Sequence, residues 1–290
     1  MNNLRGAILM VISMASFALE DMFIKLMRET LPAGQIFIFV GTGGAISFAL
    51  LALARREAPL DRSLTERPVL IRTAFELISS MGFVIALAVV PISLMTTIIQ
   101  ANPVLVTLGA ALFFAEPVGS RRWAAIFIGL AGVLIVLRPW QSNFDVAALL
   151  VVLGVLFQAA RDLTTRRITS KVGSIQLSVL TFSAFIPFGG LLLALQGSPF
   201  IFPTPQTWIY VGGAVIVALP AFYTIVAAMR IGDISFVAPF RYARIVFGLL
   251  IGVLIFDEQL DTAMVFGAIL IICSGLFTLI REARLRQRPS

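Results

Sequence analysis

The sequence contains no histidine, a single cysteine and few charged residues, and each shortage excludes a class of protein. Without histidine the chain lacks the commonest metal ligand and the usual proton carrier near neutral pH, so a proton-linked step would need a carboxylate or water. The lone Cys273 excludes an intrachain disulfide and a cysteine metal cluster. The phosphate-binding pattern G-x-x-x-x-G-K followed by serine or threonine is also absent, so we do not expect ATP-driven pumping. We expect no cofactor and no metal.

Long apolar runs fill the chain almost from end to end. Hydrophobic residues make up 59% of the 290 residues, charged residues make up 13%, and the mean hydropathy is +0.99. An ordinary soluble domain has about 25% charged residues, and a chain this apolar would aggregate in water. A helix of about 20 apolar residues crosses a bilayer. The runs predict ten such helices, near residues 6–27, 34–54, 72–90, 94–115, 122–138, 146–165, 174–196, 207–228, 234–256 and 262–280. The predicted fold class is an all-α membrane protein.

The basic residues predict the orientation of these helices. The net charge of +7 comes from arginines in short loops between apolar spans, so it indicates topology rather than nucleic-acid binding. With the N-terminus inside, most of the loop arginines fall on the cytoplasmic side, and only Lys25, Arg28 and Arg138 fall opposite. This asymmetry predicts that both termini are cytoplasmic. The expected partner is therefore the lipid bilayer.

The two halves of the sequence resemble each other. A shift of 141 residues places Asp21 on Asp162, and a shift of 142 places Ile92-Ser93 on Ile234-Ser235. Each half holds five predicted spans, an odd number, so the second half must insert upside down relative to the first. Inverted repeats are typical of secondary transporters, with the substrate site near the midplane between the halves. We predict one five-helix repeat over 1–140, a second over 141–282, and a basic cytoplasmic tail over 283–290.

A set of short motifs in the first half recurs in related form in the second. They are Pro91-Ile92-Ser93, Pro103, Phe114-Ala115-Glu116 and Gly129/Gly132 in the first half, with Asp233-Ile234-Ser235, Phe256-Asp257-Glu258 and Gly267/Gly275 in the second. They resemble the EamA-type repeat of the drug/metabolite transporter superfamily. The resemblance implies a ten-helix exporter of small metabolites in a bacterial inner (plasma) membrane, with amino acids a frequent class and the aromatic amino acid exporters the nearest branch. One departure is that the second half moves its proline to Pro239, so the halves are not equivalent.

Ionisable residues inside spans are costly, so they usually face a partner or a water-filled cavity. Glu20 shares a helix face with Ser13 and Ser16, which is consistent either with a proton or amine site on a cavity wall or with a glutamate paired to an arginine. Arg241 and Arg244 share a face of the ninth span. They would either recognise a carboxylate, which a guanidinium matches with paired donors, or neutralise an acidic residue.

The full set of predicted cavity residues combines these charges with polar side chains that gather around prolines. It consists of Glu20, Glu76, Gln100, Asn102, Gln158, Arg161, Tyr223, Arg241, Tyr242 and Arg244. The alternative for the polar members is a hydrogen bond to a neighbouring helix, worth about 0.6 kcal/mol on average in membranes.

Two further groups have predicted structural roles. Asp21 with Lys25, and Asp162 with Arg166, are acid–base pairs four residues apart, a spacing that stabilises helix ends. Pro103, Pro187, Pro220 and Pro239 lie inside spans, where proline kinks a helix and serves as a hinge or as a static wedge.

Together these observations favour a secondary transporter that exports small metabolites, amino acids first among them, by alternating access through a central cavity. The cargo could instead be a drug-like compound, a nucleoside or S-adenosylmethionine. A channel or a non-transporting scaffold remain as other classes, and an enzyme is not expected because no nucleophile or metal constellation is present. We expect a monomer or a weak homodimer.

Overall fold

The computed structural model describes residues 2–114, 119–141, 145–165, 168, 172–231 and 234–286, and over these ranges the chain is helical with no strand. The long helices are α1 (Asn2–Arg28), α2 (Ala33–Ala54), α3 (Arg67–Ala86), α6 (Ser120–Leu137), α7 (Ala148–Thr165), α8 (Ser174–Gln196), α9 (Pro205–Ile231) and α12 (Thr262–Arg286). The remaining spans are built from shorter helices. These are α4 (Ile92–Ile99) with α5 (Asn102–Phe113), and α10 (Ile234–Val237), η2 (Ala238–Tyr242) and α11 (Ala243–Phe256). A short turn, η1 (Arg62–Thr65), precedes α3.

The apolar runs form helices at the predicted places. Within the described ranges, eight stretches are long and apolar enough to cross a membrane, and two shorter apolar helices cover Trp123–Leu137 and Thr262–Thr278. A backbone in lipid must satisfy its own hydrogen bonds, which a helix does within one segment. The predicted all-α membrane fold is confirmed. The helix α12 continues to Arg286, so the predicted tail 283–290 begins inside a helix, and 287–290 lie outside the described residues.

The fourth and ninth spans are interrupted where the sequence has proline. Pro103 lies in the first turn of α5, where its missing N–H costs nothing, but it cannot donate to a carbonyl of the preceding turn. The backbone at the break instead tightens, with Ala101 N donating to the Ile98 carbonyl over 2.9 Å. Pro239 begins the tight turn η2 in the ninth span. Pro187 and Pro220 lie inside the continuous helices α8 and α9.

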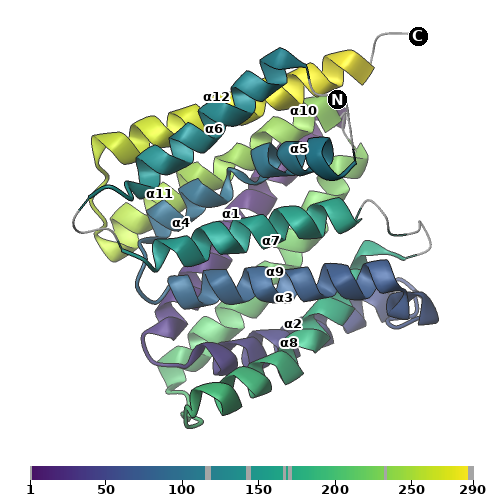
Figure 1. Cartoon of the computed structure of the whole chain (residues 1–290). Helices are drawn as coiled ribbons and strands as arrows, with labels where there is room; N and C mark the ends of the chain where they lie inside the picture. Colours follow the sequence, from purple (N-terminus) through teal and green to yellow (C-terminus); the bar gives the residue numbers. More distant parts are fainter. Residues whose placement is uncertain are drawn as a thin grey trace.

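The helices pair in a pattern that follows the repeat. α2 packs along α8, α6 along α12, and α4 against α11 (Figure 1), and in each case the two helices are counterparts in the two halves. α1 packs along α9, and α3 along α7. The repeat shift carries α1 onto α7 and α3 onto α9. The pair α1–α9 therefore corresponds to the pair α7–α3 in the other half. The pairing is that of two repeats related by a two-fold axis, and it interleaves them.

The core has two main parts. One lies around α2 and α8, where Phe48 and Phe182 stack with ring centroids 5.4 Å apart. The other lies around α4, where Ile92, Met95 and Ile98 are buried against α7 and α12. Large apolar side chains such as Leu50, Ile216 and Leu254 remain exposed on the outer faces, as expected for surfaces that contact lipid. The break in the fourth span lies within this second part, to which Ile99 and Ala101 also belong.

Candidate functional site

A belt of charged side chains joins α3 and α7 inside the bundle. Arg161 places one guanidinium nitrogen 2.7 Å from Glu76 and another 2.7 Å from Asp162. Arg72, one turn before Glu76, lies 3.2 Å from the same Glu76 carboxylate and donates to the Thr181 hydroxyl on α8. These side chains are between 13% and 27% exposed. The acids and bases neutralise each other, which a low-dielectric interior requires.

The interrupted fourth span contacts this belt, and it also contacts the interrupted ninth span. Asn102, at the start of α5, donates its amide to Asp162 over 2.8 Å. Gln100, just before the break, donates to the main-chain carbonyl of Arg241 in η2 over 2.8 Å. The repeat shift places Gln100 beside Arg241 and Tyr242, so counterpart segments are in contact here. This contact lies where the two-fold axis of the repeats passes.

A second ion pair joins α11 to α1. Arg244 lies 2.6 Å from Asp21, and its guanidinium also covers the ring of Phe17 at 5.2 Å. Lys25 pairs with Glu258 at 3.7 Å. The predicted pairing of Asp21 with Lys25 is therefore wrong, because Asp21 reaches Arg244 on α11, which packs against α1, and Lys25 reaches Glu258 in the segment after α11. Arg166 lies outside the described residues, and Asp162 instead contacts Arg161 and Asn102.

Two predicted charges have no such partner. Glu20 is half-buried and makes no ion pair or hydrogen bond with the described part of the chain, although Asp21, Arg244 and Glu76 lie close enough to act on it electrostatically. The Arg241 guanidinium likewise forms no ion pair with a described residue, although it acts electrostatically on Asp162. Among the described residues of the predicted cavity set, Glu20 and Arg241 are therefore the charges without an ion-pair partner.

Three predicted polar residues carry buried atoms with no hydrogen-bond partner in the described part of the chain. They are the side-chain carbonyl oxygens of Asn102 and Gln158 and the hydroxyl of Tyr242. Tyr242 projects against Gly275 of α12, where the absence of a Cβ leaves room for its hydroxyl. Buried polar atoms are nearly always hydrogen-bonded, so unpaired ones need a reason, and a site for a polar solute is one such reason.

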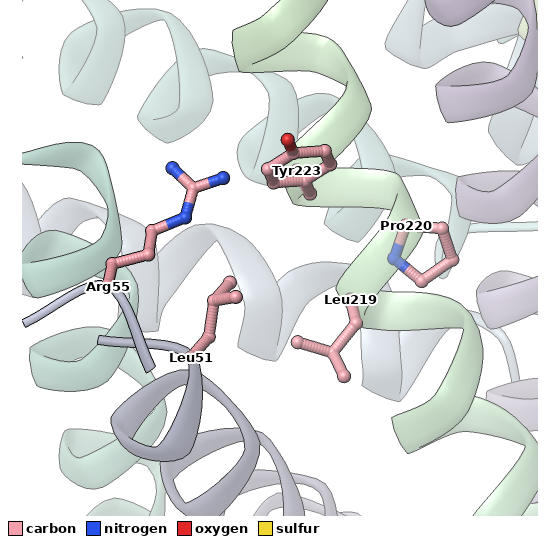
Figure 2. A pocket seen from close by; sticks show the side chains of 5 residues that line it. All are labelled: Leu51, Arg55, Leu219, Pro220 and Tyr223. Carbon is pink, nitrogen blue, oxygen red and sulfur yellow. The ribbon is translucent and has the colours of Figure 1, made fainter. Parts of the chain in front are cut away.

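Tyr223 lies elsewhere, in a hollow between α2 and α9. Figure 2 shows its ring beside Arg55, with Leu51, Leu219 and Pro220 completing the wall. The hollow measures about 350 Å³, and the Arg55 guanidinium lies 4.9 Å from the centre of the Tyr223 ring. From the sequence alone, Arg55 is one of the loop arginines that indicate topology. Its position against the Tyr223 ring could not be predicted, because it depends on the packing of α2 against α9. A cation over an aromatic ring offers a flat, positively charged surface.

Comparison with known protein families shows which family the chain belongs to. The model of the EamA-like transporter family matches residues 4–138 and again 145–280. The chain belongs to this family. It is a multi-pass inner-membrane transporter of small molecules in the drug/metabolite transporter superfamily, which confirms the resemblance noted in the sequence.

Individual relatives differ in their cargo. The chain is 30% identical over 287 residues to a riboflavin transporter of Rhizobium johnstonii, covering 98% of this chain and 94% of the relative. It is 25% identical to the pseudopaline exporter CntI of Pseudomonas aeruginosa, with coverage of 92% and 93%. It is 24% identical to an S-adenosylmethionine uptake transporter of Rickettsia prowazekii, with coverage of 68% and 66%. These names include both export and uptake, so membership of the family does not determine the direction.

A solved structure confirms the fold alone. A crystal structure titled only as that of a protein superposes with a TM-score of 0.67 at 19% identity, covering 98% of both chains. The aromatic amino acid exporter branch is not supported by these comparisons and stays a prediction. The oligomeric state also stays a prediction.

Proposed function

We propose that the protein is a secondary transporter that carries a small, uncharged heteroaromatic metabolite of the riboflavin kind across the inner membrane by alternating access. The observation that carries the proposal is the similarity to a riboflavin transporter over nearly the whole of both chains. Riboflavin is a flat ring system with imide and hydroxyl groups and no net charge at neutral pH. Its recognition needs hydrogen-bonding groups and apolar surfaces more than free charges.

The interior supports this solute class. Most interior charges neutralise one another, as Arg161 does with Glu76 and Asp162, and Arg244 with Asp21. The buried polar atoms of Asn102, Gln158 and Tyr242 that lack a partner within the described ranges are neutral. A neutral polar solute would hydrogen-bond with such atoms without breaking an ion pair. Gln100 belongs to the same proposed site, because its amide reaches the Arg241 main-chain carbonyl across the repeats; the Arg241 side chain takes no part in this contact.

Export of an amino acid is the second candidate, because one specific observation favours it. Glu20 carries a carboxylate and Arg241 a guanidinium, and neither has an ion-pair partner among the described residues. A zwitterion would supply an ammonium to the first and a carboxylate to the second. The two candidates therefore depend on different residues of the interior.

Counterflow into proteoliposomes that contain the purified protein tests both candidates. We expect saturable uptake of labelled riboflavin, and about fivefold weaker apparent affinity in Tyr242→Phe, since one buried hydrogen bond is worth about 1 kcal/mol. Glu20→Gln and Arg241→Gln should retain riboflavin uptake. An amino acid carrier would give the reverse: uptake from an amino acid panel that Glu20→Gln or Arg241→Gln abolishes.

Arg138→Gln is the matched control, because Arg138 pairs with Asp261 at the bundle end and contacts none of the proposed site residues. Folded, inserted protein that takes up neither riboflavin nor any amino acid would contradict both candidates. The cargo would then be another metabolite, such as S-adenosylmethionine, a nucleoside or a drug-like compound.

A further inference from the structure

Glu258 holds the beginning of a helix that belongs to the other repeat. Its two carboxylate oxygens accept the main-chain N–H groups of Ile92 and Ser93, over 2.7 and 3.0 Å. Ile92 is the first residue of α4, so these N–H groups have no partner within the helix and lie at its positive end. A carboxylate there makes charge-assisted hydrogen bonds, which are stronger than neutral ones. Glu258 of the second repeat thus fixes the position of the first turn of α4, which belongs to the first repeat.

The chain around Glu258 is shaped for this contact. Asp257, the residue after α11, adopts a left-handed conformation with φ of 51°. This turn lets the Glu258 N–H reach back to the Gly252 carbonyl over 2.9 Å. The Glu258 side chain then lies over the last turns of α11, facing α4.

Lys25 adds a third helix to the same contact. Its ammonium lies 3.7 Å from Glu258, donates to the Val90 carbonyl over 2.8 Å, and lies 5.1 Å from the centre of the Phe256 ring. The Lys25 and Glu258 side chains are only 16% and 10% exposed. α1, the segment before α4, and the end of α11 are therefore tied together around one buried carboxylate.

Glycine permits the close approach of α4 and α11 beneath this contact. A Cβ on Gly252 would come within 2.6 Å of the Glu258 carboxylate and 3.3 Å of the Ser93 side chain. A Cβ on Gly248 would overlap Thr96. Because α4 and α11 are counterparts in the two repeats, their separation at this end would be a movement of one repeat relative to the other.

We propose that Glu258, held by Lys25, is a positioning residue that locks this end of the transport pathway closed by binding the start of α4. The end concerned is the one away from the start of α1 and the end of α12 (Figure 1). A buried carboxylate that leaves its partners must gain water instead, so release of α4 and entry of water at this end occur together. The inference goes beyond the proposed function and is independent of the identity of the solute.

The solvent accessibility of residue 93 tests whether Glu258 holds this end of the pathway closed. Ser93 is 1% exposed and its hydroxyl has no hydrogen-bond partner among the described residues, so Ser93→Cys removes no hydrogen bond that the structure shows. The native Cys273 is replaced by serine, so that the reporter is the only thiol. Purified protein in detergent is treated with a water-soluble thiol reagent, and the modification rate is measured. We expect Glu258→Gln to raise this rate about tenfold or more, the effect expected for loss of a hydrogen bond to a charged group.

Two further variants make the result decisive. Gly252→Ala should raise the rate as well, since the added methyl group separates α4 from Glu258 without changing a charge. Arg138→Gln, which removes a more exposed ion pair to Asp261 at the same end, should leave the rate unchanged. An unchanged rate in Glu258→Gln protein that elutes as a folded species would overturn the proposal, as would an equal rise in Arg138→Gln. If Glu258→Gln does not fold, Gly252→Ala decides.

The measurement needs no solute. It therefore remains readable whether or not the protein transports riboflavin. Failure of the riboflavin proposal would appear only in counterflow, and failure of the lock would appear only in the thiol reaction.

Discussion

At the scale of single residues, Arg161 shares one guanidinium between Glu76 on α3 and Asp162 on its own helix. Asp162 also accepts the Asn102 amide from α5. The planar guanidinium carries five N–H donors, so it can bind two carboxylates in different directions. A lysine at this position would offer only a point charge. The side chain of Arg161 thus links the packing of α3 on α7 to the break in the fourth span.

Arg161→Gln should destabilise the protein strongly. The substitution leaves Asp162 without its guanidinium partner and Glu76 with Arg72 alone, and breaking a buried pair costs about 3–5 kcal/mol. Arg138→Gln at the more exposed pair with Asp261 should cost less than about 1 kcal/mol. Thermal unfolding of both variants in the same detergent measures the difference. Equal midpoints for the two variants would show that the belt contributes no stability.

At the scale of elements, α2 and α8 approach closely through a pair of glycines. A Cβ on Gly34 would lie 2.5 Å from the Gly189 carbonyl oxygen, and one on Gly189 would lie 2.3 Å from that of Gly34. Helices in lipid gain little from apolar burial alone, so association relies on such close packing. The neighbouring Gly190 faces open space.

Gly189→Ala and Gly190→Ala form a matched pair on adjacent residues of α8. Gly189→Ala must move backbone atoms apart and should cost about 1–3 kcal/mol, the usual range for overpacking. Gly190→Ala should be neutral or stabilise by up to about 1 kcal/mol, because alanine is the better helix former. Unfolding midpoints compare the two. A Gly189→Ala protein as stable as wild type would mean that α2 and α8 do not pack through this contact.

At the scale of the whole molecule, the two repeats are interleaved rather than placed side by side. α1 of the first half packs along α9 of the second, and α7 of the second packs along α3 of the first. The polar residues then collect where the interrupted fourth and ninth spans meet, at Gln100 and Arg241. A solute bound there contacts both halves, which is the geometry that alternating access requires.

Orientation in the membrane is tested with reporter fusions. With both termini cytoplasmic, alkaline phosphatase fused after Gly197 should be active, and the same enzyme fused after Arg56 should be inactive. Green fluorescent protein at these sites should give the opposite pattern, because it fluoresces only when it folds in the cytoplasm. The physical basis is the excess of arginine in the loop around Arg56. Active phosphatase after Arg56 would reverse the predicted orientation.

The candidate site was only partly predictable from the sequence. A charged side chain inside the bilayer has a high free-energy cost, which indicates that Glu76, Arg161 and Arg244 need partners. The structure provides those partners. The spacing rule failed for Asp21, whose partner Arg244 lies 223 positions away. Glu258 was noticed only as a repeat match, since nothing in the local sequence indicates that it binds the start of α4.

The class of fold, the places of the spans and the repeat can be predicted from the sequence alone. The reason is that a bilayer imposes a length and an apolar composition on every helix, and both are local properties of the chain. Tertiary packing sets which charges neutralise each other. It also sets which predicted cavity residues keep a charge or a buried polar atom without a described partner, among them Glu20, Arg241, Asn102, Gln158 and Tyr242. Those outcomes depend on which helix faces meet, and that is set by packing between segments far apart in the chain.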